Sequence, residues 1–240
     1  SEVSPYVTGC PYCGTRLRRR APKLERRDGA LEAQRPRRRR PRLRRRPASG
    51  APRTFRPYAT AAAILGSAAL LLIQQASGGE LFTFGGVATP FHDEWWRLFT
   101  APFAYVNVGY LFVVALGLAI FATGVERRLG SFPTAVLLVA CGALGLLAGT
   151  AVANAEDSFA LIAGGNGMAL GAVAAWFTIR RAEARGAIAE EYDTIGVVVA
   201  AAVLIALPLF VETADLVAGL TGGVVGALAG LVATATHAGE

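Results

Sequence analysis

Long apolar stretches alternate with short polar segments from residue 58 to the C-terminus. Each apolar stretch holds about 17–21 residues, close to the length that a helix needs to cross a hydrocarbon core of ~30 Å. None carries the polar stripe, repeating near every 3.6 residues, that marks a helix at the surface of a soluble protein. The six stretches run over 58–76, 104–123, 134–153, 159–179, 195–211 and 214–234. The pattern therefore predicts an all-α, polytopic membrane protein with six transmembrane helices.

Small residues recur three or four positions apart in three of these stretches. Such spacing produces smooth helix faces along which two backbones can approach closely. A chain rich in glycine would produce one such pair by chance, but three helices with the same spacing predict a compact bundle. The glycines are Gly142, Gly145 and Gly149 in the third stretch, Gly167 and Gly171 in the fourth, and Gly222, Gly226 and Gly230 in the sixth.

The first 56 residues are strongly basic, whereas the rest of the chain is slightly acidic. They contain 18 of the 24 Lys and Arg and 4 of the 17 Asp and Glu, so their net charge is 18 − 4 = +14. The remainder has a net charge of 6 − 13 = −7. The pI and the mean hydropathy of the whole chain therefore describe neither part. We predict three segments: a cysteine-containing segment over 1–15, a basic linker over 16–56 and a membrane domain over 57–236.

Most basic residues of the membrane domain lie at one end of the predicted bundle. Five of its six arginines follow the second and fourth stretches, and short loops rich in Lys and Arg stay in the cytoplasm. We therefore expect a multi-pass protein of the cell membrane with both termini in the cytoplasm. The five are Arg127, Arg128, Arg180, Arg181 and Arg185, whereas the opposite loops carry Glu80, Asp93, Glu94, Glu156, Asp157, Glu212 and Asp215, with Arg97 as their only cation.

Cys10 and Cys13 form a Cys-Pro-Tyr-Cys-Gly segment typical of a zinc knuckle. A structural zinc site needs four ligands, so this pair is half of a zinc ribbon. A second chain or residues upstream of Ser1 could complete it. Otherwise the pair is a vestigial knuckle with free thiols, since the cytosol disfavours disulfides. Cys141 lies within the third stretch and cannot contribute, and the membrane domain itself requires no cofactor.

Nine arginines interrupted by prolines dominate the part of the basic linker between residues 35 and 47. Self-repulsion and proline oppose a packed core, so we expect this linker to be disordered and extended. Next to a membrane, each basic residue near anionic lipid gains roughly 1 kcal/mol, which favours contact with anionic lipid. Nucleic acid could be bound through its phosphates, but no aromatic residues are interleaved to stack bases, so no specific nucleic acid is expected.

Four segments of the membrane domain resemble signatures of the rhomboid family of intramembrane serine proteases. They are 94–103 (EWWRLFTAPF), 124–130 (GVERRLG), 164–167 (GGNG) and 219–223 (GLTGG), and the first resembles the family's Trp-Arg motif in a long outer loop. The resemblance extends from residue 58 to the C-terminus and implies the six-helix bundle of bacterial rhomboids. The residues that match the family motifs are Trp96, Arg97, Glu126, Gly164, Gly167, Gly222 and Gly223.

The resemblance implies a serine nucleophile on the fourth helix, in a Gly-x-Ser-Gly motif, and a histidine on the sixth helix before a Gly-Gly pair. In this chain these two positions are Asn166 and Leu220. A serine hydroxyl becomes a nucleophile when an adjacent base takes its proton. An amide cannot form the acyl intermediate and leucine cannot accept a proton. We therefore predict a catalytically inactive member of the family, a pseudoprotease.

Active members also carry a His-xxx-Asn pair on the second helix that helps to stabilise the oxyanion. The matching positions are Tyr110 and Val114, of which only tyrosine could donate a hydrogen bond. Losing one such donor typically costs about 10²–10³ in rate. The two histidines of the chain, His92 and His237, lie outside the predicted spans. No other pair in the sequence therefore replaces the missing dyad.

Inactive branches of the superfamily bind transmembrane client proteins and govern their stability or trafficking, and this resemblance implies the same role here. The alternative is a rhomboid endopeptidase whose dyad is not recognised. A transporter or channel would normally place ionisable residues inside its spans, and here the span interiors contain none.

Four polar or amphipathic residues have two interpretations each. The Asn166 amide either bonds the fourth helix to the second or sixth, with Tyr110 as partner, or contacts the backbone of a client. Trp95 and Trp96 are expected at the outer membrane interface, as simple anchors or as a client surface. We expect the Arg97 charge to reach headgroups or loop carbonyls.

Overall fold

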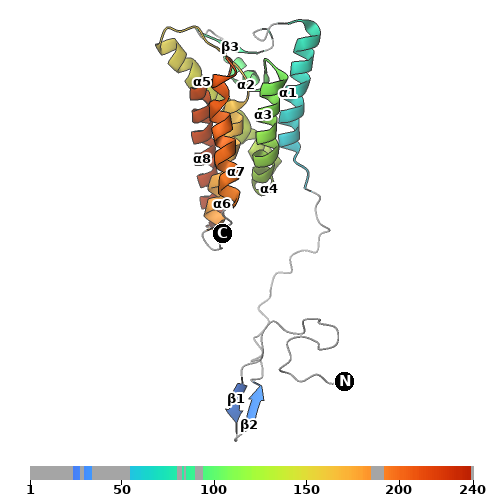
Figure 1. Ribbon diagram of the computed structural model, residues 1–240, viewed down its shortest axis with the longest axis vertical. Helices are drawn as coiled ribbons and strands as arrows, with labels where there is room; N and C mark the ends of the chain where they lie inside the picture. Colours follow the sequence, from blue (N-terminus) through green and yellow to red (C-terminus); the bar gives the residue numbers. More distant parts are fainter. Residues whose placement is uncertain are drawn as a thin grey trace. The chain divides into compact units, whose positions relative to one another are not determined.

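The computed structural model describes residues 24–27, 30–33, 55–79, 83, 85–89, 94–184 and 192–238 (Figure 1). The chain divides into two units, 1–53 and 54–240. In the first unit, β1 (Leu24–Arg27) and β2 (Ala30–Ala33) pair antiparallel. This hairpin differs from the expectation of a linker disordered throughout 16–56. The sequence between the two strands is Asp-Gly, a pair that favours tight hairpin connections.

Helices form in all six stretches that the apolar pattern marks. All six belong to the second unit and stand side by side in Figure 1. Four helical runs of the described chain are long and apolar enough to cross a membrane: 58–77, 108–129, 131–155 and 216–235. The count of six spans stays a prediction, because α6 and α7 are not among the helices that are both long enough and apolar enough to cross a membrane. The helices are α1 (Tyr58–Ser77), α3 (Val108–Gly117) continued by the π-helical η2 (Leu118–Ala122) and α4 (Thr123–Leu129), α5 (Ser131–Ala155), α6 (Asn166–Ala184), α7 (Tyr192–Ala206) continued by η3 (Leu207–Leu209), and α8 (Leu216–Ala238).

The fourth stretch begins as a strand and turn, so its helix starts later than the predicted residue 159. β4 (Leu161–Ile162) pairs antiparallel with β3 (Val87–Ala88) of the first outer loop. Gly164 then takes a φ of 95°, in the left-handed region that favours glycine, and α6 begins at Asn166. Because β4 pairs with a segment more than 70 residues earlier, the first residues of this predicted span form a strand and a turn instead of a helix.

A similar shift moves the second helix, which begins at Val108 instead of residue 104. Two short helical turns, α2 (Arg97–Thr100) and the 3₁₀ turn η1 (Ala101–Phe103), precede it. The Asn107 side chain then caps α3 by accepting a hydrogen bond from the Tyr110 backbone N–H over 2.8 Å. An apolar run alone does not predict this cap.

α6 is the most buried helix of the membrane domain and packs closely against α8. A Cβ at Gly222 would meet the backbone of Gly167, and a Cβ at Gly226 would meet the backbone of Gly171, one turn further along both helices. On the α5 side, Gly145 approaches the Ala218 carbonyl of α8 in the same way. The predicted glycine faces are therefore confirmed, and they bring three helix backbones together.

Glu126, in the motif that ends the second helix, holds the start of α1. Its carboxylate is buried and accepts hydrogen bonds from the backbone N–H groups of Ala59 (2.8 Å) and Thr60 (3.0 Å). The Thr60 hydroxyl donates a third bond over 2.7 Å. The first N–H groups of a helix have no partner within it, so a carboxylate placed here satisfies them and complements the helix dipole. The match of Glu126 to a family motif thus has a structural reason.

Candidate functional site

The candidate site lies where α6 begins, next to α8 and α3. Asn166 is the first residue of α6, and its side chain is 2% exposed. Neither its Oδ1 nor its Nδ2 has a hydrogen-bond partner in the described part of the chain. A buried amide without partners is uncommon, because it costs about 1–3 kcal/mol. The first residue of α6 therefore combines burial with unused hydrogen-bonding capacity.

Gly219 of α8, and not Leu220, faces Asn166. A Cβ at position 219 would lie 2.7 Å from Asn166 Nδ2, whereas the Leu220 side chain is 48% exposed on the outside of the bundle. The difference follows from the helix period. Gly222 and Gly226 contact α6, so the residue one turn before Gly222 on the same face is Gly219. The residue of α8 that faces Asn166 is therefore Gly219 and not the expected Leu220, and glycine, like leucine, has no proton acceptor.

Tyr110 lies beside the turn that precedes Asn166 but does not bond to the Asn166 side chain. Its hydroxyl donates to the Ala163 carbonyl over 3.3 Å, and its ring lies against Gly164, where a Cβ would overlap it. The expectation that Tyr110 partners the amide is therefore wrong. Val114, the second oxyanion position, is fully buried in the apolar core and offers no donor.

Tyr105 completes the packing of this turn, and the sequence motifs do not identify it as a site residue. Its hydroxyl accepts a hydrogen bond from the Gly165 N–H over 3.1 Å, and its ring meets that of Tyr110 edge to face at 5.1 Å. Thr213 also belongs to the site, since its carbonyl accepts the Ala163 N–H over 3.0 Å and its buried hydroxyl has no hydrogen-bond partner among the described residues. Neither residue belongs to a motif, but Gly219 could have been found from its three-residue spacing to Gly222.

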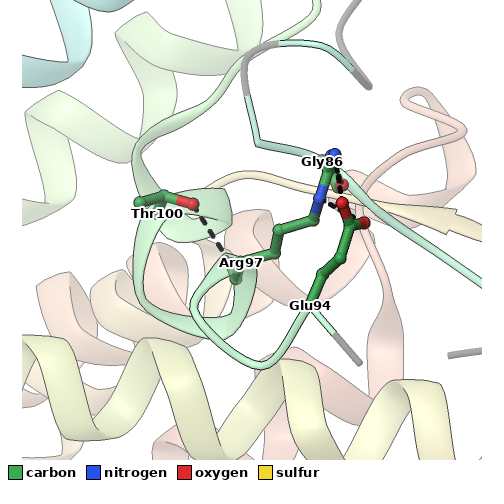
Figure 2. A network of polar contacts seen from close by, with 4 residues as sticks. All are labelled: Gly86, Glu94, Arg97 and Thr100. Carbon is green, nitrogen blue, oxygen red and sulfur yellow. Dashed lines mark hydrogen bonds and ion pairs between the residues drawn. The ribbon is translucent and has the colours of Figure 1, made fainter. Parts of the chain in front are cut away.

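Arg97 of the Trp-Arg motif connects the loop between α1 and α2 to the start of α2 (Figure 2). Its Nη1 donates to the Gly86 carbonyl over 3.0 Å, and its Nε lies 2.7 Å from Glu94 Oε2. The Arg97 side chain is buried and bonds to a loop carbonyl, as expected. The expectation of lipid headgroup contact is not supported, because the guanidinium is enclosed by its own loop.

Exposed aromatic side chains lie at the protein surface next to the buried Arg97. Trp95 is 66% and Trp96 is 44% exposed, and Phe99 meets the Trp95 ring edge to face at 6.4 Å. The Arg97 guanidinium lies 5.0 Å from the centroid of the Trp96 ring. Arg97 therefore contacts the Trp96 ring of an exposed aromatic surface, which we call the tryptophan surface (Trp95, Trp96 and Phe99). Large exposed apolar surfaces of this kind contact lipid or other proteins.

The described side chains contain no serine and histidine pair. His92 lies outside the described residues, and of His237 only the backbone is described. Ser67 is buried in α1 beside Tyr105. Cys10, Cys13 and the arginine tract of the linker also lie outside the described residues, so zinc binding and lipid binding by that region stay predictions. The Asn166 amide itself offers hydrogen-bonding atoms but neither a nucleophilic hydroxyl or thiol nor a base.

The long apolar helices and the buried polar turn between them define a polytopic helical membrane protein. The rhomboid domain family matches residues 92–236, more than half of the 240-residue chain. The chain belongs to the rhomboid family. No curated protein matches it.

Proposed function

We propose that this rhomboid-family protein binds transmembrane segments of client proteins without cleaving them. The observation that carries the proposal is that Asn166, which the resemblance matches to the family's serine, faces Gly219. Covalent catalysis needs a hydroxyl or thiol nucleophile and a base within hydrogen-bond reach. A carboxamide and a glycine supply neither. The fold keeps its close helix packing while the chemistry of the position is lost.

Two features support a binding role. The tryptophan surface is exposed at one end of the bundle and is held in place by the buried Arg97. The Asn166 amide has two buried hydrogen-bonding atoms without partners among the described residues, and a polar group supplied by a client would satisfy them if α8 moved away from the start of α6. Binding at such a position would be favoured because it removes an existing cost in the free protein.

Reaction with a serine-directed fluorophosphonate probe tests the absence of proteolysis. We expect no specific labelling of the purified chain and no cleavage of a generic rhomboid substrate, while an active rhomboid treated in parallel is labelled. Labelling of one serine, lost when that serine is changed to alanine, would establish an unrecognised nucleophile and would refute the proposal.

Photocrosslinking in membranes tests the binding role. A photoreactive residue at position 96 should crosslink to transmembrane client proteins, and the Asn166→Leu change should reduce the yield. A photoreactive residue at Phe132, which is 80% exposed at the start of α5, provides a control at the opposite end of the bundle. Equal yields from the two positions, or a yield that Asn166→Leu leaves unchanged, would contradict a client site that includes these residues.

We also propose that all six helices span the cell membrane, with both termini in the cytoplasm. The arginines at the ends of α4 and α6 and the basic linker support this orientation. The linker would then contact anionic lipid on the same side. Impermeant thiol reagents applied to single-cysteine variants check it: cysteines at 156 and 212 should react from outside intact cells, whereas a cysteine at 131 should not.

A further inference from the structure

Three segments that connect helices at one end of the bundle are joined by backbone hydrogen bonds. The first follows α1, the second follows α5 and the third follows α7. The Thr89 N–H of the first donates to the Ala160 carbonyl of the second over 2.9 Å. The Ala163 N–H of the second donates to the Thr213 carbonyl of the third over 3.0 Å. The segments 78–107, 156–165 and 207–215 therefore lie at the same end, and we call them the loop surface.

The loop surface is strongly acidic. Its sequence contains seven Asp and Glu residues and one arginine, so its net charge is 1 − 7 = −6. The arginine is Arg97, which is buried and lies 2.7 Å from a carboxylate oxygen of Glu94 (Figure 2). Glu156, Asp157 and Glu212 are exposed and form no ion pair with a described residue. The field of this surface therefore attracts cations.

Trp95 and Phe99 form an aromatic corner on the loop surface. Phe99 lies four residues after Trp95, and the two ring planes stand at 85° with their centroids 6.4 Å apart. Both rings are exposed. The neighbouring Trp96 ring contacts a cation of the chain itself, since the Arg97 guanidinium lies 5.0 Å from the ring centroid. The corner therefore offers further aromatic surface to a cation from outside the chain.

We propose that the corner of Trp95 and Phe99 binds a lysine or arginine side chain beside the transmembrane helix of a client protein. The inference rests on the client binding proposed above and names the chemistry of the client. The negative face of an aromatic ring attracts a cation, and the acidic loop surface adds attraction at longer range. The occupant is a protein cation because a phospholipid also brings a phosphate, which the net charge of −6 repels.

Such recognition would select clients by their topology. The basic residues of most membrane proteins flank the cytoplasmic ends of their spans. The loop surface lies at the end opposite to the arginines that follow α4 and α6. Transmembrane proteins with Lys or Arg at the end that meets the loop surface are therefore a minority, and the corner distinguishes them from the rest.

Photocrosslinking to model transmembrane peptides tests the corner in the full chain. The protein carries a photoreactive residue at position 96, which leaves Trp95 and Phe99 in place, and is reconstituted in phosphatidylcholine vesicles. Two peptides share one apolar helix and differ only in a pair of flanking residues, Lys-Lys or Gln-Gln. The Lys peptide should reach half-maximal crosslinking at about fivefold lower mole fraction, as expected for one exposed cation–π contact.

Two variants show whether the preference comes from the corner. Trp95→Leu combined with Phe99→Leu keeps an apolar surface and should abolish the Lys preference, while unchanged crosslinking of the Gln peptide shows that the protein is folded. Phe159→Leu is the matched control, because Phe159 is an exposed ring of the loop surface outside the corner, and the fivefold preference should remain. A preference that survives the double change, or that Phe159→Leu also abolishes, would overturn the proposal.

The peptide assay also separates this proposal from the proposed function. Equal crosslinking of the two peptides, or crosslinking of neither, would overturn cation binding and leave the corner to lipid. Client proteins captured at position 96 in membranes test the proposed function independently. Their capture together with equal yields of the two peptides would refute cation binding alone.

Discussion

Replacing Gly222 with alanine should weaken the contact between α6 and α8 more than replacing the adjacent Gly223 does. A Cβ at this position would lie 2.5 Å from the Gly167 Cα and 2.7 Å from its carbonyl carbon. These are backbone atoms, so the contact cannot be relieved by rotating a side chain. Ordinary contact requires about 3.5–4.0 Å, so the helices must separate by about 1 Å.

Gly223 provides the control for this substitution, because a Cβ there would lie 3.8 Å from Leu170 Cβ, an ordinary contact. Alanine improves helix propensity by about 1 kcal/mol over glycine, and this gain applies equally to both positions. The difference between Gly222→Ala and Gly223→Ala therefore isolates the helix contact. Overpacking of this kind costs about 1–3 kcal/mol, and we expect that difference in the free energy of unfolding.

Unfolding in mixed micelles, followed by circular dichroism, measures this difference. Gly222→Ala should unfold at a lower denaturing-detergent fraction than Gly223→Ala, and Gly226→Ala should behave like Gly222→Ala, because a Cβ there would lie 2.6 Å from the Gly171 Cα. Equal stability of Gly222→Ala and Gly223→Ala would show that the α6 and α8 backbones are not in contact, and would refute the reasoning.

Three further substitutions use the same unfolding measurement. Glu126→Gln leaves one acceptor oxygen for three donors of α1, so we expect a loss of about 1.5–3 kcal/mol; unchanged stability would mean that the carboxylate does not hold α1. Arg97→Lys keeps the charge but cannot bond both Gly86 and Glu94 with a rigid fork, so we expect about 1–2 kcal/mol less stability and faster proteolysis of the first outer loop; a loop that is cleaved at the wild-type rate would contradict this. Asn166→Leu removes a buried amide that has no partner, so stability should be unchanged or rise by up to about 1–3 kcal/mol; a clear loss would reveal a partner for the amide.

The sequence alone predicts the apolar helices and their close packing. Length and hydropathy are properties of contiguous residues, so the stretches near 58–76 and 134–153 correspond closely to α1 and α5. Glycines three or four apart share one helix face whatever the partner, so the contact of Gly222 with Gly167 follows from their spacing. The prediction that Asn166 stands where the family has a serine likewise rests on a single short motif of the sequence.

The tertiary structure alone determines how residues distant in sequence meet at the site. The start of α6 at Asn166 depends on pairing between 87–88 and 161–162, and no local pattern encodes that register. The identity of the residue opposite Asn166 depends on which face of α8 turns inward, and a shift of one residue exchanges Gly219 for the exposed Leu220. Successive residues of a helix point about 100° apart around its axis, so an error of one residue in a motif turns the wrong side chain toward the site. Only a contact between helices shows which face of α8 points inward.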